Sequence, residues 1–167
     1  SKSSLFKDGI FHNNFISHHV SSFKKFLQWR KESKTPDPIT FPLAKHNPVF
    51  LKNNRITPTI TWVGHATFLI QIAGLNILTD PHFTERASPF SFASPSRTTP
   101  VGLKIEDLPK IDLIVISHNH YDHLDKETIQ ELIKKQNNHQ PLILVPLKLK
   151  KKLEGCYVTV PTKQQKY

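Results

Sequence analysis

Apolar and polar residues alternate along residues 60–72, so that every second side chain is hydrophobic within each of two short stretches. The apolar positions are Ile60, Trp62, Phe68, Ile70 and Ile72. A period of two is typical of β-strands with one half-buried face. Gly74 interrupts the alternation as a hairpin turn does, and residues 75–78 resume it. The pattern therefore predicts two or three antiparallel strands in succession.

A different pattern follows residue 110. Residues 111–117 form a nearly continuous apolar run, which indicates a buried strand. Asp125 suits the N-cap of a helix that ends at residues 136–139. The buried stripe of this helix is Ile129, Leu132 and Ile133. Later elements are expected as strands at 142–145 and 157–160 and a short basic helix at 147–155. Strands that alternate with helices imply parallel crossovers, so we expect a mixed α/β (α+β) fold.

The first 56 residues have the character of an extension to this folded core. Phe23, Phe26, Leu27 and Arg30 fall at helical spacing, with lysines around them. Such a helix either packs on the domain or meets a membrane surface as a basic amphipathic helix, and we favour packing. Four prolines between residues 35 and 48 predict an extended linker. We therefore divide the chain into a helical extension with a Pro-rich linker at 1–56 and a folded domain at 57–167.

Composition narrows the range of partners. The net charge is +10, from 23 basic and 13 acidic residues, which favours a phospholipid surface, a phosphate ester or nucleic acid. Cys156 is the single cysteine of the sequence, so no internal disulfide forms and a reducing compartment is expected. No apolar run approaches the length of a membrane span, and there is no signal-peptide pattern. We expect a protein that is cytoplasmic or peripheral to a membrane.

The densest cluster of reactive side chains follows the apolar run at 111–117. Three imidazoles and one carboxylate fall within six residues, as His118, His120, Asp122 and His123. Imidazole and carboxylate together suit zinc, iron or manganese. On extended backbone the first two histidines point to one side, and the second pair, at the turn, can face a second metal. A charged cluster beside a hydrophobic strand needs partners or a metal, so we expect these four side chains to bind metal.

The motif and several neighbouring segments resemble one enzyme family. Residues 117–125, Ser-His-Asn-His-Tyr-Asp-His-Leu-Asp, look like the metal-binding signature of the metallo-β-lactamase superfamily. Four further segments resemble its N-acylphosphatidylethanolamine-hydrolysing phospholipase D branch. These segments are residues 61–67, 78–81, 86–89 and 107–109. The resemblance covers the N-terminal half of the family's fold.

The resemblance implies an αββα sandwich, in which two sheets lie between helices, with two zinc ions at one edge. It implies that the four motif residues ligate metal, and we also assign Asp122 to catalysis. His65 is expected either to line the pocket or to cap a turn. Asp80 is expected to hydrogen-bond a ligand imidazole from outside the metal's own shell.

A long segment rich in proline separates the early strands from the motif. It runs from residue 81 to residue 109 and holds five prolines. A long loop within a compact domain is usually functional or disordered. We expect it either to cover the metal site, where Arg86 or Arg97 would hold a substrate phosphate, or to be a solvated loop.

The family completes its site with ligands from a second half: another His, a bridging Asp and a last His. After His123 the sequence holds only Asp125 and His139 as further residues of these types, and neither stands where the family places its ligands. We therefore expect a fragment, a truncated product, or a half that needs a partner. Alone it should hold metal only in part, be nearly inactive, and expose an apolar sheet face that favours self-association.

The activity that the resemblance implies is metal-dependent hydrolysis of a phosphodiester. The expected substrate is N-acylphosphatidylethanolamine, cleaved as a phospholipase D would, and the expected partners are this phospholipid and a membrane surface. Nucleic acid is not an expected partner. The alternatives are another hydrolase of the same fold, such as a lactonase or a nuclease, or an inactive lipid-binding fragment.

Overall fold

The computed structural model describes residues 6–7, 10–11, 23–32, 42–87, 97, 99–136, 139–146, 149 and 153. The chain divides into two compact units, one of Ser1–Asp37 with Lys163–Tyr167 and one of Pro38–Thr162. In the first unit, β1 (Phe6–Lys7) pairs antiparallel with β2 (Ile10–Phe11), and α1 spans Phe23–Glu32. The helix expected around Phe23 is therefore present. None of the helices in the described residues is long and apolar enough to cross a membrane.

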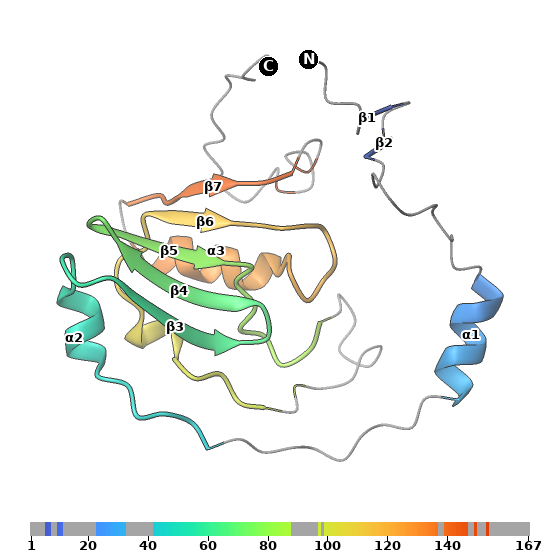
Figure 1. Ribbon diagram of the computed structural model, residues 1–167, viewed down its shortest axis with the longest axis horizontal. Helices are drawn as coiled ribbons and strands as arrows, with labels where there is room; N and C mark the ends of the chain where they lie inside the picture. The colour runs from blue at the N-terminus through green and yellow to red at the C-terminus, as the bar shows by residue number, and fades with distance from the viewer. Residues whose placement is uncertain are drawn as a thin grey trace. The chain divides into compact units, whose positions relative to one another are not determined.

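The second unit is built on one five-stranded sheet with the order β3-β4-β5-β6-β7 (Figure 1). Its strands are β3 (Thr59–Gly64), β4 (Thr67–Ile72), β5 (Leu75–Thr79), β6 (Leu113–Val115) and β7 (Leu142–Leu144). The first three pair antiparallel, and β5, β6 and β7 pair parallel. The antiparallel opening and the parallel crossovers are both confirmed. The helix expected at 147–155 and the strand at 157–160 lie almost wholly outside the described residues.

A short helix stands where the sequence predicted extended linker. α2 spans Pro48–Asn53, and Asn47 caps it by accepting a hydrogen bond from the Phe50 N–H at 3.0 Å. The prediction of linker through Pro48 was wrong because proline is well suited to the first turn of a helix, where its missing N–H is not needed. A 3-10 turn, η1 (Ile105–Asp107), follows later, before β6.

One face of the sheet is buried beneath α3 (Lys126–Lys135). The core includes Leu69, Leu78, Ile114 and Ile143 from the sheet, together with Ile129 and Leu132 from the helix. The carboxylate of Asp125 accepts a hydrogen bond from the Thr128 N–H at 3.1 Å, so the predicted N-cap is confirmed. The sheet and α3 thus form two packed layers, and the strand ends lie at the edge of the sheet.

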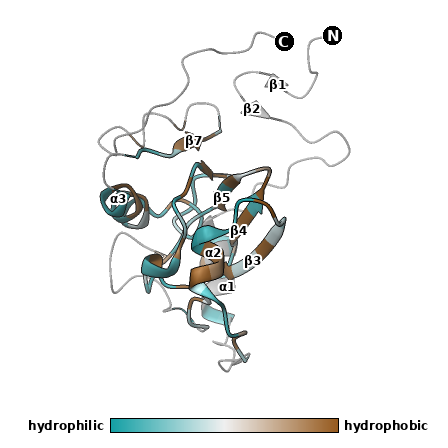
Figure 2. Cartoon of the chain, turned by 90° about the vertical axis from the view of Figure 1, so that its left-hand side faces the viewer, coloured by the Kyte–Doolittle hydropathy of each residue, from teal (hydrophilic) through white to brown (hydrophobic). Residues whose placement is uncertain are grey.

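The alternating apolar residues that predicted the strands lie mainly on the other face, which is open. Ile60 is 73% exposed, and Trp62, Phe68 and Ile72 are also exposed. The register places Ile60, Ile70, Ile77, Leu113 and Leu142 in one row across all five strands. Figure 2 shows hydrophobic bands along β3. The strands were predicted correctly, and of the five alternating residues Ile60 is the most exposed and Ile70 the least.

The buried face tolerates polar residues because they satisfy one another. Gln71 is 2% exposed, and its side-chain oxygen accepts hydrogen bonds from Asn54 at 3.1 Å and Thr59 at 3.0 Å. Its Nε2 donates to the Leu51 carbonyl and to Asn76 Oδ1, both at 2.8 Å. A buried polar group that keeps its hydrogen bonds costs little. This network fastens the end of α2 to the sheet.

Two leucines on β5 offer a matched comparison of the faces. Leu78 is fully buried and Leu75 is 46% exposed. Leu78→Ala should lower the free energy of unfolding by about 2–5 kcal/mol because it leaves a cavity in the core. Leu75→Ala should change it by no more than about 0.5 kcal/mol. Urea unfolding followed by circular dichroism measures both. Equal losses that grow with protein concentration would mean that association covers the open face.

Candidate metal centre

The predicted motif leaves the sheet at the carboxyl end of β6 and turns back immediately. The N–H groups of His123 and Leu124 both donate to the His120 carbonyl, at 3.0 and 2.8 Å, and so close a tight turn. This turn gathers the imidazoles. The ring centroid of His118 lies 4.0 Å from that of His123 and 4.6 Å from that of His120. Because β5 and β6 are parallel, the residues that follow β5 reach the same edge.

Asp80, which follows β5, lies against the motif. Its carboxylate accepts hydrogen bonds from the Ser117 N–H at 2.7 Å, the Ser117 hydroxyl at 2.7 Å and His123 Nδ1 at 2.9 Å. Asp80 has a φ of +35°, in the left-handed region, which aspartate tolerates better than most residues. With its Nδ1 donating to Asp80, the neutral His123 ring presents an unprotonated Nε2. The hydrogen bond that the sequence led us to expect is present, and its role toward a metal stays a prediction.

Ser117 was not among the predicted site residues, yet it connects two of them. Its hydroxyl donates to Asp80 and lies 2.9 Å from His118 Nδ1, from which it can accept a hydrogen bond. One buried carboxylate therefore orients His123 directly and His118 through a hydroxyl. The sequence signal for Ser117 was its position beside the first histidine of the motif.

Asp122 lies between two imidazoles. Its Oδ2 is 2.9 Å from His65 Nε2 and 3.5 Å from His123 Nε2. Partial burial pushes the pKa of Asp122 up, but its own backbone N–H, the His123 imidazole whenever it is protonated, and the hydrogen bond from His65 together lower it. The carboxylate is thus held in the ionised form that binds cations.

The donors at this edge suit a metal in type and in position. One ligand atom each from His65, Asp122 and His123 lies within 4.8 Å of the others. Oxygen and imidazole nitrogen are ordinary zinc ligands, and the Nδ1 atoms of His118 and His123 are engaged by Ser117 and Asp80. His120 contributes its ring to the cluster of imidazoles but not to this group of three.

The two arginines predicted to bind phosphate lie in the segment after β5. Arg97 Nη2 donates to the His82 carbonyl at 2.7 Å and lies 2.8 Å from His82 Nδ1. Gly64, with a φ of +151°, makes room for it, because an added Cβ would meet Arg97 Nη1 at 3.1 Å. Arg97 therefore braces this segment. The carbonyl of Arg86 accepts a hydrogen bond from Thr84 at 3.2 Å. Phosphate binding by either arginine stays a prediction.

The beginning of that segment is hydrogen-bonded to Asp125, the N-cap residue of α3. Thr84 donates its backbone N–H to Asp125 Oδ2 at 3.2 Å and its hydroxyl to the same oxygen at 2.8 Å. Burial, and then the Arg97 guanidinium, lower the pKa of His82, which keeps its imidazole neutral. Residues 88–96 and 98 lie outside the described part of the chain, so the expectation that the segment covers the metal site falls largely on them.

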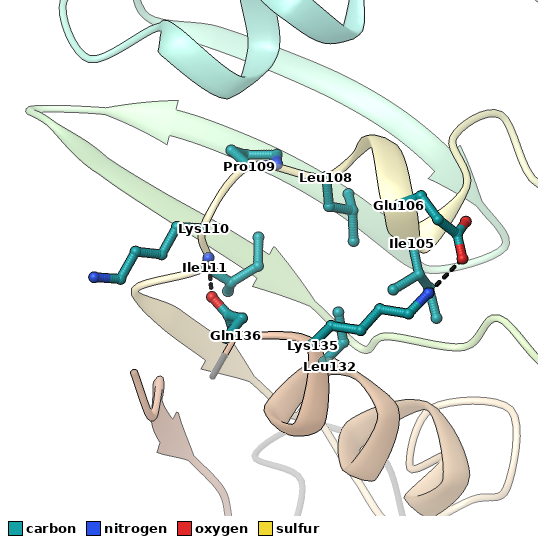
Figure 3. A pocket seen from close by; sticks show the side chains of 9 residues that line it. All are labelled: Ile105, Glu106, Leu108, Pro109, Lys110, Ile111, Leu132, Lys135 and Gln136. Atoms are coloured by element: carbon teal, nitrogen blue, oxygen red, sulfur yellow. Dashed lines mark hydrogen bonds and ion pairs between the residues drawn. The ribbon is translucent and has the colours of Figure 1, made fainter. Parts of the chain in front are cut away.

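A cavity of about 420 Å³ lies elsewhere, between η1 and the C-terminal end of α3 (Figure 3). Glu106 and Lys135 form an ion pair beside it, and Gln136 Oε1 accepts a hydrogen bond from the Ile111 N–H at 2.6 Å. Its lining contains none of the predicted site residues. The candidate site at the strand edge is therefore separate from this cavity.

Comparison with known proteins matches this chain to one domain family and to several curated proteins. A model of the β-lactamase superfamily domain matches residues 59–164. The N-acyl-phosphatidylethanolamine-hydrolyzing phospholipase D 1 of Caenorhabditis elegans is 48% identical over 93 residues, which cover 54% of this chain and 25% of that protein. A metal-dependent hydrolase of Hyperthermus butylicus is 39% identical over 66 residues, 39% of this chain and 23% of that protein.

A solved structure shows similarly partial overlap. The isothiocyanate hydrolase from Delia radicum gut bacteria matches with a TM-score of 0.48 and 26% identity, covering 63% of this chain and 41% of that one. The chain thus spans about a quarter of the length of the two curated relatives named above.

The hydroxyl of Ser117 can be tested by itself. Ser117→Ala should weaken zinc binding about 10- to 100-fold, because neighbours that orient ligand imidazoles have effects of this size. Ser117→Thr keeps the hydroxyl and should bind zinc nearly as the unchanged chain does. Titration against a competing chelator gives both affinities. An unchanged affinity in the alanine variant would show that the hydroxyl does not orient a ligand.

Proposed function

The chain belongs to the β-lactamase superfamily, and on that premise we propose that it carries part of the metal centre of a phosphodiester hydrolase. The proposed reaction is phospholipase D-like cleavage of N-acylphosphatidylethanolamine. One observation carries the proposal: the His-x-His-x-Asp-His motif lies at the strand edge beside Asp80. The similarity of 93 residues of this chain to the nematode phospholipase D supports the choice of reaction. The substrate rests on that similarity.

The residues have distinct parts in the proposed reaction. His118 and His120 would hold one metal ion, and Asp122 and His123 a second. When bound, such ions supply an activated water and positive charge for the phosphoryl oxygens. Asp122 is the proposed catalytic residue, since its ionised carboxylate would fix the distance between metal and substrate. Asp80 and Ser117 keep the imidazole rings in place while the phosphodiester binds.

The charge of the chain agrees with an anionic substrate at a membrane surface. The net charge is +10, and the described residues of α1 include exposed lysines such as Lys24 and Lys31. Basic residues near an anionic bilayer are attracted to it and steer a protein toward its lipids. We infer peripheral contact, with α1 as the described part of the contact surface. Lys148, Lys150, Lys151 and Lys152, a second basic cluster, lie outside the described residues.

Lipid hydrolysis is the direct test of the proposed function. The chain with added zinc should release little phosphatidic acid from N-acylphosphatidylethanolamine, because one of the two metals would have only His118 and His120 as protein ligands. Fusion to the part of the nematode relative that follows the matched segment should restore release, and His118→Ala should abolish it. A folded fusion that cleaves a lactone or RNA but leaves the lipid intact would favour the alternative hydrolases.

Membrane contact through α1 is tested by sedimentation with anionic vesicles. Replacing Lys24 and Lys31 with glutamine should weaken binding about 30-fold, since each basic residue near such a surface contributes about 1 kcal/mol. Replacing Lys126 and Lys134 of α3 with glutamine makes the same charge change elsewhere and serves as the control. Equal weakening in the two variants would assign the effect to net charge and remove α1 as the contact.

A further inference from the structure

We propose that His65 is a third protein ligand for the metal ion bound by Asp122 and His123. One complete site for a single divalent cation such as zinc would then lie within residues 65–123. This inference rests on the metal centre of the proposed function and deepens it, because His65 lies outside the histidine motif and comes from a different pair of strands.

The distances fit a tetrahedral ion. Zinc–nitrogen and zinc–oxygen bonds of about 2.0–2.1 Å place neighbouring ligand atoms about 3.3 Å apart. The separation from Asp122 Oδ2 is 2.9 Å to His65 Nε2 and 3.5 Å to His123 Nε2. These two values lie on either side of the required spacing, and the ligand atoms of the two histidines lie within 4.8 Å of each other. Rotations of the side chains would therefore bring all three atoms into the shell.

The proton positions at His123 point to a cation between these atoms. Because Nδ1 of His123 donates to Asp80, the neutral ring has a lone pair on Nε2. The same Nε2 lies 3.5 Å from the carboxylate oxygen Oδ2 of Asp122. Two acceptors that face each other repel, and a metal ion bound to both removes the repulsion.

His65 reaches this point through an unfavourable backbone conformation. His65 has a φ of +49°, in the turn between β3 and β4, and the strand register shifts between Trp62 and Gly64 just before it. Such bulges re-aim side chains and occur often beside active sites. A left-handed conformation at a residue other than glycine is unfavourable and is found where the surroundings impose it. The shifted strand thus accounts for the reach of His65 to the motif.

The turn is held firmly enough to preform a ligand. Trp62 Nε1 donates to the His65 carbonyl at 3.0 Å, and the Thr79 hydroxyl donates to the Ala66 carbonyl at 2.8 Å. Thr67 Oγ1 donates to the Asp80 carbonyl at 2.8 Å, which ties the turn to the residue that orients His123. Three protein ligands with a free fourth position is the arrangement of catalytic zinc.

Zinc titration of the 167-residue chain against a competing chelator tests the proposal. His65→Gln can keep the hydrogen bond to Asp122 without an imidazole, and His65→Asn suits the left-handed backbone, so between them they separate ligation from folding. Both variants should lower the zinc affinity about 100-fold. A residue that only orients a ligand changes the affinity about 10- to 100-fold, so the expected loss lies at the upper end of that range. His46→Gln, a half-buried histidine outside the cluster, should leave the affinity unchanged.

Nitrogen NMR of the imidazoles supplies a readout independent of affinity. One equivalent of zinc should remove the proton from His65 Nε2 and shift its resonance, and it should also shift the resonance of the already unprotonated His123 Nε2. The proposal is overturned if both His65 variants bind zinc as the unchanged chain does, or if His65 Nε2 keeps its proton in the zinc-loaded chain, which would make it an orienting neighbour of Asp122. Unchanged affinity in Asp122→Asn and His123→Gln, or no zinc binding by the unchanged chain, would instead overturn the metal centre of the proposed function.

Discussion

The geometry of the candidate metal centre depends on the buried carboxylate of Asp80. It is the point where the ends of β5 and β6 are joined, since the Asp80 N–H donates to the Val115 carbonyl at 2.8 Å while its side chain accepts from Ser117 and His123. Three hydrogen bonds to one ionised group offset its left-handed backbone and its burial. Without this carboxylate the turn of the motif would have no fixed relation to the sheet, and the imidazoles would have no preferred proton positions.

Local patterns predicted the elements and the motif, but not what brings them together. Alternation located the hairpins, and Asp125 marked the start of α3. The burial of Gln71 could not be predicted from the sequence, because its hydrogen bonds to Leu51, Asn54 and Asn76 form only in the folded sheet. The place of His65 beside Asp122 depends on a strand bulge and on a contact between residues 57 positions apart, which a linear pattern does not contain.

The two faces of the sheet differ in composition and in what covers them. The face under α3 combines an apolar core with a satisfied polar network around Gln71. The open face carries a row of aliphatic side chains from Ile60 to Leu142. Exposed apolar area of this kind marks an interaction surface or an aggregation hazard. Both surfaces lie in a chain that spans only part of the length of its relatives.

The strand order also separates local contacts from contacts that need a long loop to close. β3, β4 and β5 are joined by tight turns, so their contacts are local and can form within microseconds. That meander already brings His65 and Asp80 to one edge. β6 joins only after the chain from residue 80 to residue 112 has closed as a loop, which is entropically slower. The early hairpins can therefore form before the motif joins them. A cation that binds only the complete edge would stabilise the fully folded state over these partly folded ones.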